Sequence, residues 1–308
     1  MSSLQASLTQ AIRRRDKLSR MTNAMRLVNG VGDHLDGLLI DRYNQHLHVQ
    51  VLKGSWLSQI NEICDILAKA FPVDFLIVKT RQGLDLKEQI LIGSDPKTVV
   101  EENNLKFEVN LNDGLNCGLF LDMRHNRQMI GPSCKDKKVF NGFSYTCSFG
   151  LYARESGARE VVNIDISRKI LQRGQINYQL NGQAFTDGEF IVADSMSYLT
   201  RAFKKGNEFD VIILDPPSFA RYGSKVFQVK RDLPKLMALA VSVLNPKGRL
   251  LVSTNYSEIS HAHLERMLAA GLNGRRVEHI QRVGQDEDFT GSNTFKESYL
   301  AGLWVKFL

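Results

Sequence analysis

Cysteine is scarce in this 308-residue sequence and forms no recognisable site. Its four copies, Cys64, Cys117, Cys134 and Cys147, include no CxxC pair and no spacing typical of zinc ligands. The pattern excludes a disulfide scaffold and fits free thiols in a reducing compartment. We therefore expect a cytoplasmic protein without a metal site.

Long apolar runs are also missing, since no stretch approaches the ~18–20 consecutive residues that span a bilayer. Arg13, Arg14, Arg15 and Lys17 interrupt the apolar residues near the N-terminus, which argues against a signal peptide. A hydrophobic fraction of 43% and a charged fraction of 24% exclude disorder and collagen. The sequence predicts a soluble protein of one large domain or two ordinary ones.

Basic residues exceed acidic ones, 40 against 33, which gives a formal net charge of +7. This balance favours a polyanionic partner, although many basic proteins bind none. An amphipathic helix is predicted from Leu4 to Met21, within an N-terminal region of residues 1–24. Its arginines either lie on a solvated face or bind phosphates.

A small α+β domain of mixed topology is predicted over residues 25–112. A helix should begin near Ser55, an N-cap residue, with Trp56 and Ile60 among the apolar residues on one face. Short strands separated by turns are predicted at Arg26–Asn29, Gly37–Asp41, Leu47–Leu52, Phe75–Thr80 and Lys106–Val109. Nothing in this region has a catalytic pattern.

Strands and helices alternate over residues 113–308. The predicted strands are Lys138–Gly142, Glu160–Ile164, Glu189–Val192, Phe209–Leu214, Arg249–Ser253, Val277–Gln281 and Tyr299–Phe307. The predicted helices are Ser148–Gly157, Ser167–Leu180, Ser195–Lys205, Asp232–Leu244 and His261–Ala270. This spacing indicates βαβ units and a largely parallel sheet covered by helices on both faces.

Parallel sheets bind ligands at the carboxyl ends of their strands, so the residues after each strand are the candidates. The first strand is followed by Phe143–Gly150, a turn of small residues before a helix N-terminus that can receive a polar or anionic group. This turn lacks the GxGxxG pattern of dinucleotide-binding folds and the GxxxxGK[ST] phosphate loop. A dehydrogenase or an NTPase therefore loses its main support.

Acidic residues end the next two strands. Asp165 follows the second strand, where a carboxylate can bind both ribose hydroxyls of an adenosine. Asp194, which precedes Ser195, follows the third strand and could accept the amino group of an adenine ring. Each of the two aspartates could instead cap the helix that follows it.

The fourth strand ends in Asp215-Pro216-Pro217, which is the most specific signal in the sequence. The two prolines remove backbone donors and restrict the turn. The turn therefore fixes the Asp215 carboxylate and leaves its own carbonyls to accept from an amino or N–H group. Alternatively, the Asp-Pro-Pro turn is only a rigid connection out of the strand and binds no ligand.

Taken in order, these motifs resemble the class I S-adenosylmethionine-dependent methyltransferases, and within them the bacterial 23S ribosomal RNA large-subunit group. The resemblance runs from about residue 20 to the end of the chain. It rests on FSYTCSFGLYA, VVNIDISRK, FIVADS and FDVIILDPPSFA, together with RLVNG, LLIDRY, GLFLDMRHNR, QVKRD and GQDEDF.

The resemblance implies S-adenosylmethionine as cofactor and a Rossmann-like seven-stranded α/β sheet in the order 3-2-1-4-5-7-6 with an antiparallel last strand. It implies that Asp165 binds the ribose and that Asp215 faces cofactor and target base. Arg124 would lie near the methionine end as a partner for its carboxylate. The full implied cofactor set is Asp122, Arg124, Phe143, Tyr145, Thr146, Asp165, Ile166, Asp194, Ser195 and Asp215.

Three departures from the family pattern bear on function. Cys147-Ser148 stand where relatives usually have two glycines, which places side chains where the cofactor approaches the backbone. Too few residues precede the central domain for the PUA-type RNA-binding module of one branch, so RNA should dock on that domain, on the N-terminal helix or on a partner. Ser253-Thr254-Asn255-Tyr256 follow the fifth strand, where relatives that make 5-methylcytosine have a cysteine.

The missing cysteine favours a nitrogen acceptor, because carbon 5 of a pyrimidine must first be activated by a thiolate. A ring nitrogen or an exocyclic amine requires orientation only. We expect Asp215, Pro216 and Asn255 to provide that orientation. The expected substrate-binding residues, which include a basic segment after Asp-Pro-Pro, are Phe219, Arg221, Lys225, Arg231 and Tyr256.

The sequence thus predicts a methyltransferase that acts on a base nitrogen of RNA, with 23S rRNA or a ribosomal precursor as partner and no membrane. One alternative is an RNA-binding protein with impaired cofactor binding, and another is a 5-methylcytosine methyltransferase. A nicotinamide-dependent oxidoreductase is weakened by the missing glycine pattern. Methylation of a protein or a small molecule stays open, as does a homodimer.

Overall fold

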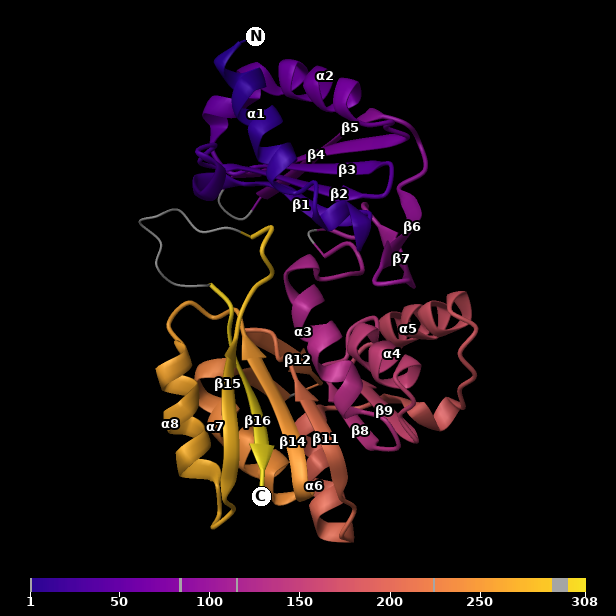
Figure 1. Cartoon of the computed structure of the whole chain (residues 1–308), viewed down its shortest axis with the longest axis vertical. Coiled ribbons are helices and arrows are strands. Elements are labelled where there is room, and N and C mark those ends of the chain that lie inside the picture. The colour runs from indigo at the N-terminus through magenta and orange to yellow at the C-terminus, as the bar shows by residue number, and fades with distance from the viewer. Residues whose placement is uncertain (1, 83–84, 115, 224, 290–298) are drawn as a thin grey trace. The chain divides into compact units, whose positions relative to one another are not determined.

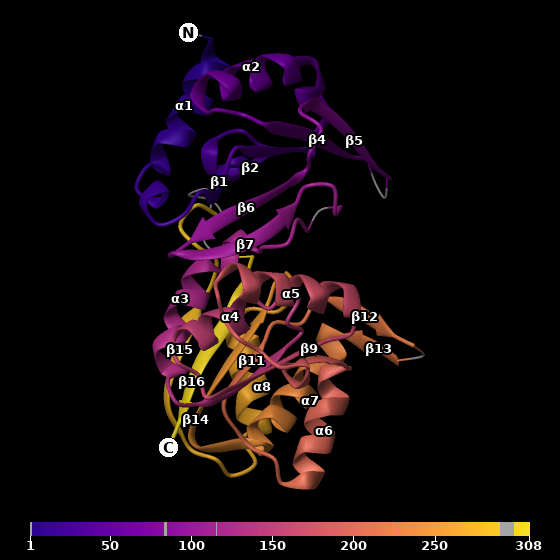
Figure 2. The same ribbon diagram turned by 90° about the vertical axis from the view of Figure 1, so that its right-hand side faces the viewer.

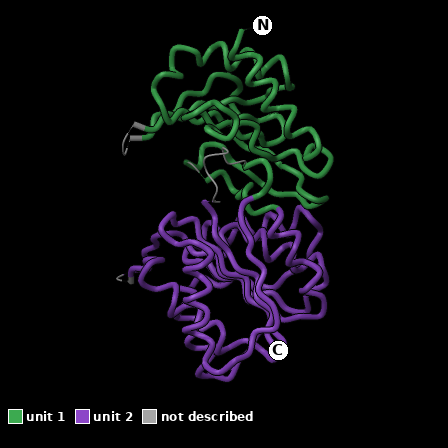
Figure 3. Tube along the Cα trace, turned by 60° about the vertical axis from the view of Figure 1, so that its left-hand side comes forward, with its two compact units in different colours: residues 1–124, 286–297 green, residues 125–285, 298–308 purple. Residues whose placement is uncertain are grey.

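The computed structural model describes residues 2–82, 85–114, 116–223, 225–289 and 299–308. The chain divides into two compact units (Figure 3). Unit 1 comprises residues 1–124 and 286–297, and unit 2 comprises residues 125–285 and 298–308. These bounds differ from the predicted domains, because the N-terminal helix is part of unit 1 and so is a segment from late in the chain.

Unit 1 contains a five-stranded sheet in the order β1-β2-β3-β4-β5 (Figure 1). Its strands are β1 (Ala24–Asn29), β2 (Leu38–Tyr43), β3 (His46–Val51), β4 (Phe75–Gln82) and β5 (Asp85–Ile92). β3 and β4 are parallel and are joined through helix α2 (Ile60–Ala70), whereas the other neighbours are antiparallel. The sequence predicted the first four strands but not β5, an edge strand whose side chains are largely exposed.

Helix α1 (Ser3–Arg14) packs into the core of unit 1 rather than standing apart. Leu8 of α1 and Leu67 of α2 are buried together with Val49 of β3. Arg15, at the end of α1, is 2% exposed and pairs with Asp33 at 2.6 Å. Arg14 also contacts Asp33 at 3.1 Å, so this one carboxylate pairs with two of the closely spaced arginines and offsets one of their two positive charges.

One local prediction for unit 1 needs correction, and another is confirmed as part of a larger element. The predicted helix start at Ser55 lies within a 3-10 helix over Gly54–Gln59, and the α-helix begins only at Ile60. The predicted strand at Lys106–Val109 is one half of a hairpin, β6 (Lys97–Glu102) and β7 (Leu105–Asn110). Asn103 and Asn104 turn this hairpin with φ of 50° and 66°, a conformation that asparagine tolerates well.

Unit 2 contains the predicted seven-stranded sheet, in the order β10-β9-β8-β11-β14-β16-β15. The order is 3-2-1-4-5-7-6 when these strands are counted along the chain, and β16 runs antiparallel to both of its neighbours. The strands are β8 (Lys138–Gly142), β9 (Glu160–Asp165), β10 (Phe190–Val192), β11 (Phe209–Leu214), β14 (Leu244–Thr254), β15 (Val277–Val283) and β16 (Ala301–Phe307). The predicted fold class is confirmed.

Helices cover both faces of this sheet. One face packs against α6 (Ser195–Lys205), α7 (Val229–Ser242) and α8 (His261–Gly271), which lie together in Figure 2. The strands β8, β9 and β10 also contact α4 (Ser148–Glu155) and α5 (Arg168–Leu180). Helix α3 (Arg124–Ile130) spans the boundary between the units. Within the described residues, no helix has the length and apolarity needed to cross a bilayer.

The segment after Asp-Pro-Pro forms a hairpin that the sequence did not predict. Its strands are β12 (Phe219–Tyr222) and β13 (Lys225–Gln228). Helix α7 then begins at Val229, earlier than the predicted Asp232. The Asp232 side chain accepts a hydrogen bond from the backbone N–H of Gln228 at 2.8 Å, so Asp232 stabilises the first turn from inside it.

Candidate active site at the strand ends of unit 2

The β8–α4 loop (residues 143–147) follows the first strand of unit 2 and has an unusual backbone. Phe143, Tyr145 and Cys147 adopt left-handed φ angles of 56°, 49° and 61°. Residues other than glycine avoid this region, at a cost of roughly 1–2 kcal/mol each. Other interactions must therefore hold the loop, and such local strain is concentrated at binding and catalytic sites.

Asp165, at the end of β9, provides one of the interactions that stabilise this loop. Its carboxylate accepts hydrogen bonds from the N–H groups of Tyr145 and Ser167, both at 3.0 Å. Burial raises the pKa of Asp165, while these backbone N–H groups oppose the rise. Each carboxylate oxygen has a second lone pair, so Asp165 can still accept from hydroxyl groups of a ligand. Ile166, which follows, is half-buried.

The end of β10 contributes Asp194 and Ser195. The Asp194 side chain accepts from the backbone N–H of Ser197 at 2.8 Å, so the capping role that the sequence allowed is present. Ser195 is buried, and its hydroxyl accepts from the backbone N–H of Phe143 at 3.1 Å. The end of the third strand is thus bonded directly to the β8–α4 loop.

Asp215 at the end of β11 is hydrogen-bonded to the neighbouring strand. The Ser253 hydroxyl in β14 donates to the Asp215 carboxylate at 2.7 Å. Ser218 likewise donates to the amide oxygen of Asn255 at 3.3 Å. Pro216 is buried, whereas Asn255 is exposed. The three predicted catalytic residues therefore lie at the adjacent carboxyl ends of β11 and β14.

The predicted substrate residues have different surroundings. Phe219 is 53% exposed at the start of β12, and Arg221 is exposed on the same strand. Arg231 donates to the Asp232 carboxylate and, at 2.6 Å, to the carbonyl of Val226, so it also braces the hairpin. The side chain of Lys225 lies outside the described part of the structure.

Tyr256 after β14 belongs to a small polar group at the surface. Its hydroxyl donates to Glu258 at 3.0 Å, and Lys230 of α7 contacts the same carboxylate at 2.6 Å. These hydrogen bonds raise the pKa of the Tyr256 hydroxyl and lower that of Glu258. Glu258 therefore neutralises Lys230, one of the cations that follow Asp-Pro-Pro.

Buried amides that were not predicted from the sequence lie in β8, β9 and α5, and one of them contacts the β8–α4 loop. Asn177 of α5 donates to the carbonyl of Thr146 at 3.0 Å. Asn141 of β8 donates to Asn163 of β9 at 2.9 Å, and Asn163 in turn donates to the Tyr178 hydroxyl at 3.2 Å. Asparagine is uncommon inside strands, so its presence in β8 and β9 was an available signal.

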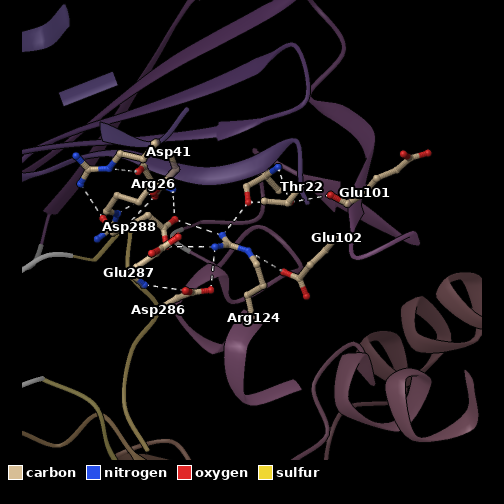
Figure 4. A network of polar contacts seen from close by, with 11 residues as sticks. Thr22, Arg26, Asp41, Glu101, Glu102, Arg124, Asp286, Glu287 and Asp288 are labelled. Carbon is tan, nitrogen blue, oxygen red and sulfur yellow. Dashed lines mark hydrogen bonds and ion pairs between the residues drawn. The ribbon is translucent and has the colours of Figure 1, made fainter. Parts of the chain in front are cut away.

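Asp122 and Arg124 belong to unit 1, where Arg124 has partners other than the predicted one (Figure 4). Its guanidinium contacts Asp286 at 2.9 Å and Asp288 at 3.3 Å, and it lies 3.7 Å from Glu102. Burial lowers the pKa of Arg124, but these carboxylates reverse the effect and raise it. Arg124 is 1% exposed and is surrounded by carboxylates of its own chain, and its predicted role at the cofactor carboxylate stays a prediction.

The four thiols are buried. Burial raises the pKa of Cys64 to about 11 and those of Cys117 and Cys134 to about 12. The pKa of Cys147 is raised further in the same direction. None of these cysteines follows β14, and each is held as a neutral thiol at physiological pH.

The comparisons with known proteins cover nearly the whole chain. The model of the S-adenosylmethionine-dependent methyltransferase family matches residues 32–292. Ribosomal RNA large subunit methyltransferase I of Tolumonas auensis is 33% identical over 296 residues, which cover 92% of this chain and 75% of that protein. The protein of the same name from Photobacterium profundum is 33% identical over 288 residues, covering 90% and 72%.

Solved structures agree with this assignment. A protein described as a methyltransferase and crystallised with SAH (S-adenosylhomocysteine) matches with a TM-score of 0.88 at 26% identity, covering 98% of this chain and 80% of that chain. An S-adenosylmethionine-dependent methyltransferase from Agrobacterium tumefaciens shares the fold, with a TM-score of 0.70 at 18% identity and coverage of 93% and 90%. The chain therefore belongs to the S-adenosylmethionine-dependent methyltransferase family.

Proposed function

We propose that the protein transfers the methyl group of S-adenosylmethionine to a base nitrogen of ribosomal RNA. The RNA substrate is supported by the two relatives named ribosomal RNA large subunit methyltransferase I, which match 92% and 90% of this chain. The net charge of +7 suits a polyanionic substrate. The relatives' names speak of large-subunit ribosomal RNA, and we propose 23S rRNA or a ribosomal precursor as the partner.

The donor groups at the strand ends of unit 2 fit the cofactor. Asp165 offers its carboxylate to the two ribose hydroxyls, while Asp194 and Ser195 border the adenine. Phe143, Tyr145, Thr146 and Ile166 line the same strand ends and complete the proposed set there. Asp122 and Arg124 remain in the set that the family resemblance implies for the methionine end. When bound, S-adenosylmethionine supplies an electrophilic methyl group on a positively charged sulfur.

The nitrogen acceptor rests on one observation, the pairing of Asp215 with Ser253 and of Ser218 with Asn255. Among the described residues this meeting point offers carboxylate, hydroxyl and amide groups but no thiol. Asp215 and the Pro216 carbonyl can accept from an amino or ring N–H and so hold the nitrogen lone pair in line. Asn255 can orient the base, and Asp215 can take up the proton that leaves.

RNA contacts are proposed on the hairpin and after β14. The exposed Phe219 ring provides a stacking surface, as does Tyr256, for a base splayed out of its strand. Arg221, Lys225 and Arg231 would contact phosphates. Arg221→Ala should weaken RNA binding at low salt and reduce its salt dependence, whereas the exposed Arg266→Ala on α8 is the matched control.

The deciding experiment combines purified protein, S-adenosylmethionine labelled in its methyl group and ribosomal RNA from cells that lack the gene. Nucleoside mass spectrometry then identifies the methylated atom. We expect a nitrogen-methylated base in the large-subunit RNA. Labelled 5-methylcytidine would refute the nitrogen acceptor, and no labelled nucleoside would refute the RNA substrate. Light scattering on the same sample distinguishes a monomer from a homodimer.

The competing hypothesis, an RNA-binding protein with impaired cofactor binding, was motivated by Cys147-Ser148. The Cys147 side chain is fully buried and packs toward Gly174 of α5, where an added Cβ would lie 2.4 Å from its sulfur. Because the Cys147 side chain points into the protein toward α5, its thiol does not obstruct the proposed cofactor site. Calorimetric titration with S-adenosylmethionine separates the hypotheses, since absence of binding at millimolar cofactor supports the impaired protein.

A further inference from the structure

The β8–α4 loop contains no glycine, although three of its five residues, Phe143, Tyr145 and Cys147, have positive φ. In a loop of this shape glycine would adopt those angles without strain. Here the strain must be offset by contacts, and backbone hydrogen bonds account for part of them. Tyr145 donates to Asp165, and Ser144 donates to the carbonyl of Ile164 at 2.9 Å.

Helix α5 supplies two further contacts, and both concern the last two residues of the loop. Asn177 is fully buried and donates to the Thr146 carbonyl at 3.0 Å. Gly174 lies one turn earlier on the same face of the helix. A Cβ at Gly174 would lie 2.4 Å from the sulfur of Cys147 and 3.0 Å from its Cβ, so only glycine leaves room for that side chain.

We propose that Gly174 and Asn177 of α5 are positioning residues for the cofactor-binding loop. Gly174 provides the space that Cys147 occupies, and Asn177 fixes the Thr146 carbonyl. Together they support, from the neighbouring helix, a loop that contains no glycine of its own. The proposal rests on the cofactor site proposed above, but it does not depend on the RNA substrate or on the acceptor atom.

The key variant is Gly174→Ala, because its methyl group displaces Cys147 and with it the loop. Calorimetric titration with SAH should show a dissociation constant raised at least about tenfold, with the binding stoichiometry unchanged. An unchanged stoichiometry shows that the protein is folded, since a merely structural defect lowers the number of competent sites. Gly188→Ala is the matched control, because its added Cβ meets only the Thr186 hydroxyl at 3.8 Å.

Rescue provides the sharper test. In Gly174→Ala combined with Cys147→Gly, the obstructing side chain is gone and residue 147 adopts its positive φ without strain. SAH affinity should return to within about threefold of the starting protein, which is a small free-energy difference. A double variant that binds no better than Gly174→Ala, or a Gly174→Ala variant that binds normally, would overturn the role of Gly174.

Asn177→Leu tests the second contact with a side chain that has the same branching but no hydrogen-bond donor. It leaves the buried Thr146 carbonyl without this donor, so SAH binding should weaken about tenfold while Gln179→Leu, on the exposed face of α5, has no effect. If Gly174→Ala fails to fold, the SAH affinity of Asn177→Leu alone tests the proposal. Normal SAH affinity in Asn177→Leu refutes the proposal. If the unmutated protein does not bind SAH, that result would instead refute the proposed cofactor site.

Discussion

Arg124 and Asp288 form a bidentate ion pair across 164 positions of sequence, with each terminal nitrogen of the guanidinium 3.3 Å from one carboxylate oxygen. Both side chains are almost completely buried. Arg124→Met should therefore destabilise unit 1 by about 3–5 kcal/mol, because it leaves the carboxylate of Asp288 buried without this partner. Urea unfolding measures the change.

Tryptophan fluorescence can restrict that measurement to unit 1. The chain has two tryptophans, Trp56 in unit 1 and Trp304 in β16, so a Trp304→Phe background leaves one reporter. Lys53→Met is the control within unit 1, since it breaks only an exposed pair with Asp36 and should change the stability far less. Equal effects of Arg124→Met and Lys53→Met would contradict the importance of the buried pair.

Asp165→Ala should weaken SAH binding while the protein stays folded. Two hydroxyl hydrogen bonds to a charged group contribute about 1.5–3 kcal/mol each, so the loss of affinity is expected to exceed about 100-fold. The alanine also removes the acceptor for Tyr145 and Ser167, whereas Asp165→Asn retains one acceptor oxygen. Calorimetry should rank the two variants in that order. Unchanged affinity in Asp165→Ala would return this residue to a capping role alone.

Cofactor affinity should also depend on pH through Asp165. Burial raises the pKa of this carboxyl from its ordinary 3.8, and binding requires the ionised form. Affinity is therefore full at neutral pH and is lost as pH falls through the raised pKa, before exposed aspartates protonate. SAH titrations from neutral pH down to about pH 4, near the ordinary pKa of exposed aspartates, measure this, with Asp165→Asn as the control that lacks the titrating group. If the SAH affinities of the unmutated protein and of Asp165→Asn depend on pH in the same way, Asp165 is not the group that titrates.

Asp215 should separate catalysis from cofactor binding. Its carboxylate lies at the proposed meeting point of donor and acceptor, so Asp215→Ala should lose methyl transfer by about 100-fold or more. SAH affinity should fall less. Ser253→Ala, which removes only the hydroxyl that donates to Asp215, should have an intermediate effect on turnover. Near-normal turnover of Asp215→Ala would refute the acceptor site.

The cysteines should all be dispensable for turnover. All four are buried, and burial raises their pKa values away from the range in which a thiolate nucleophile forms. Single substitutions by serine should retain activity per folded molecule, and RNA carrying 5-fluorocytosine should trap no covalent adduct. A trapped adduct, or one inactive cysteine variant with normal SAH binding, would establish carbon 5 as the acceptor.

The sequence predicted most of unit 2, because alternating apolar strands and helices determine a parallel sheet through local periodicity. Strands β8 and β11 and helix α6 have the predicted bounds. Unit 1 was harder, since β5 is an exposed edge and the hairpin β6–β7 depends on two asparagines in an uncommon conformation. Local patterns identify strands less reliably where burial does not impose alternation.

The strand-end aspartates were found in sequence because a carboxylate after an apolar run stands out. The ion pairs of Arg124 could not be predicted in this way, because no local pattern around residue 124 indicates Asp286 or Asp288 as partners. The contact of Cys147 with Gly174 was also hidden, because it depends on the register between a loop and a helix. Pairings between distant segments require the fold to be known first.

Residues 286–297 belong to unit 1, yet they lie in the chain between β15 and β16 of unit 2. During synthesis the ribosome therefore releases almost the entire polypeptide before Arg124 can meet Asp286 and Asp288. Unit 1 therefore cannot complete its folding before the rest of the chain is synthesised, whereas the N-terminal domains of many multidomain proteins can. A gene fragment that stops at residue 124 would encode that arginine without two of its acidic partners, so dividing the gene there does not yield two self-sufficient halves.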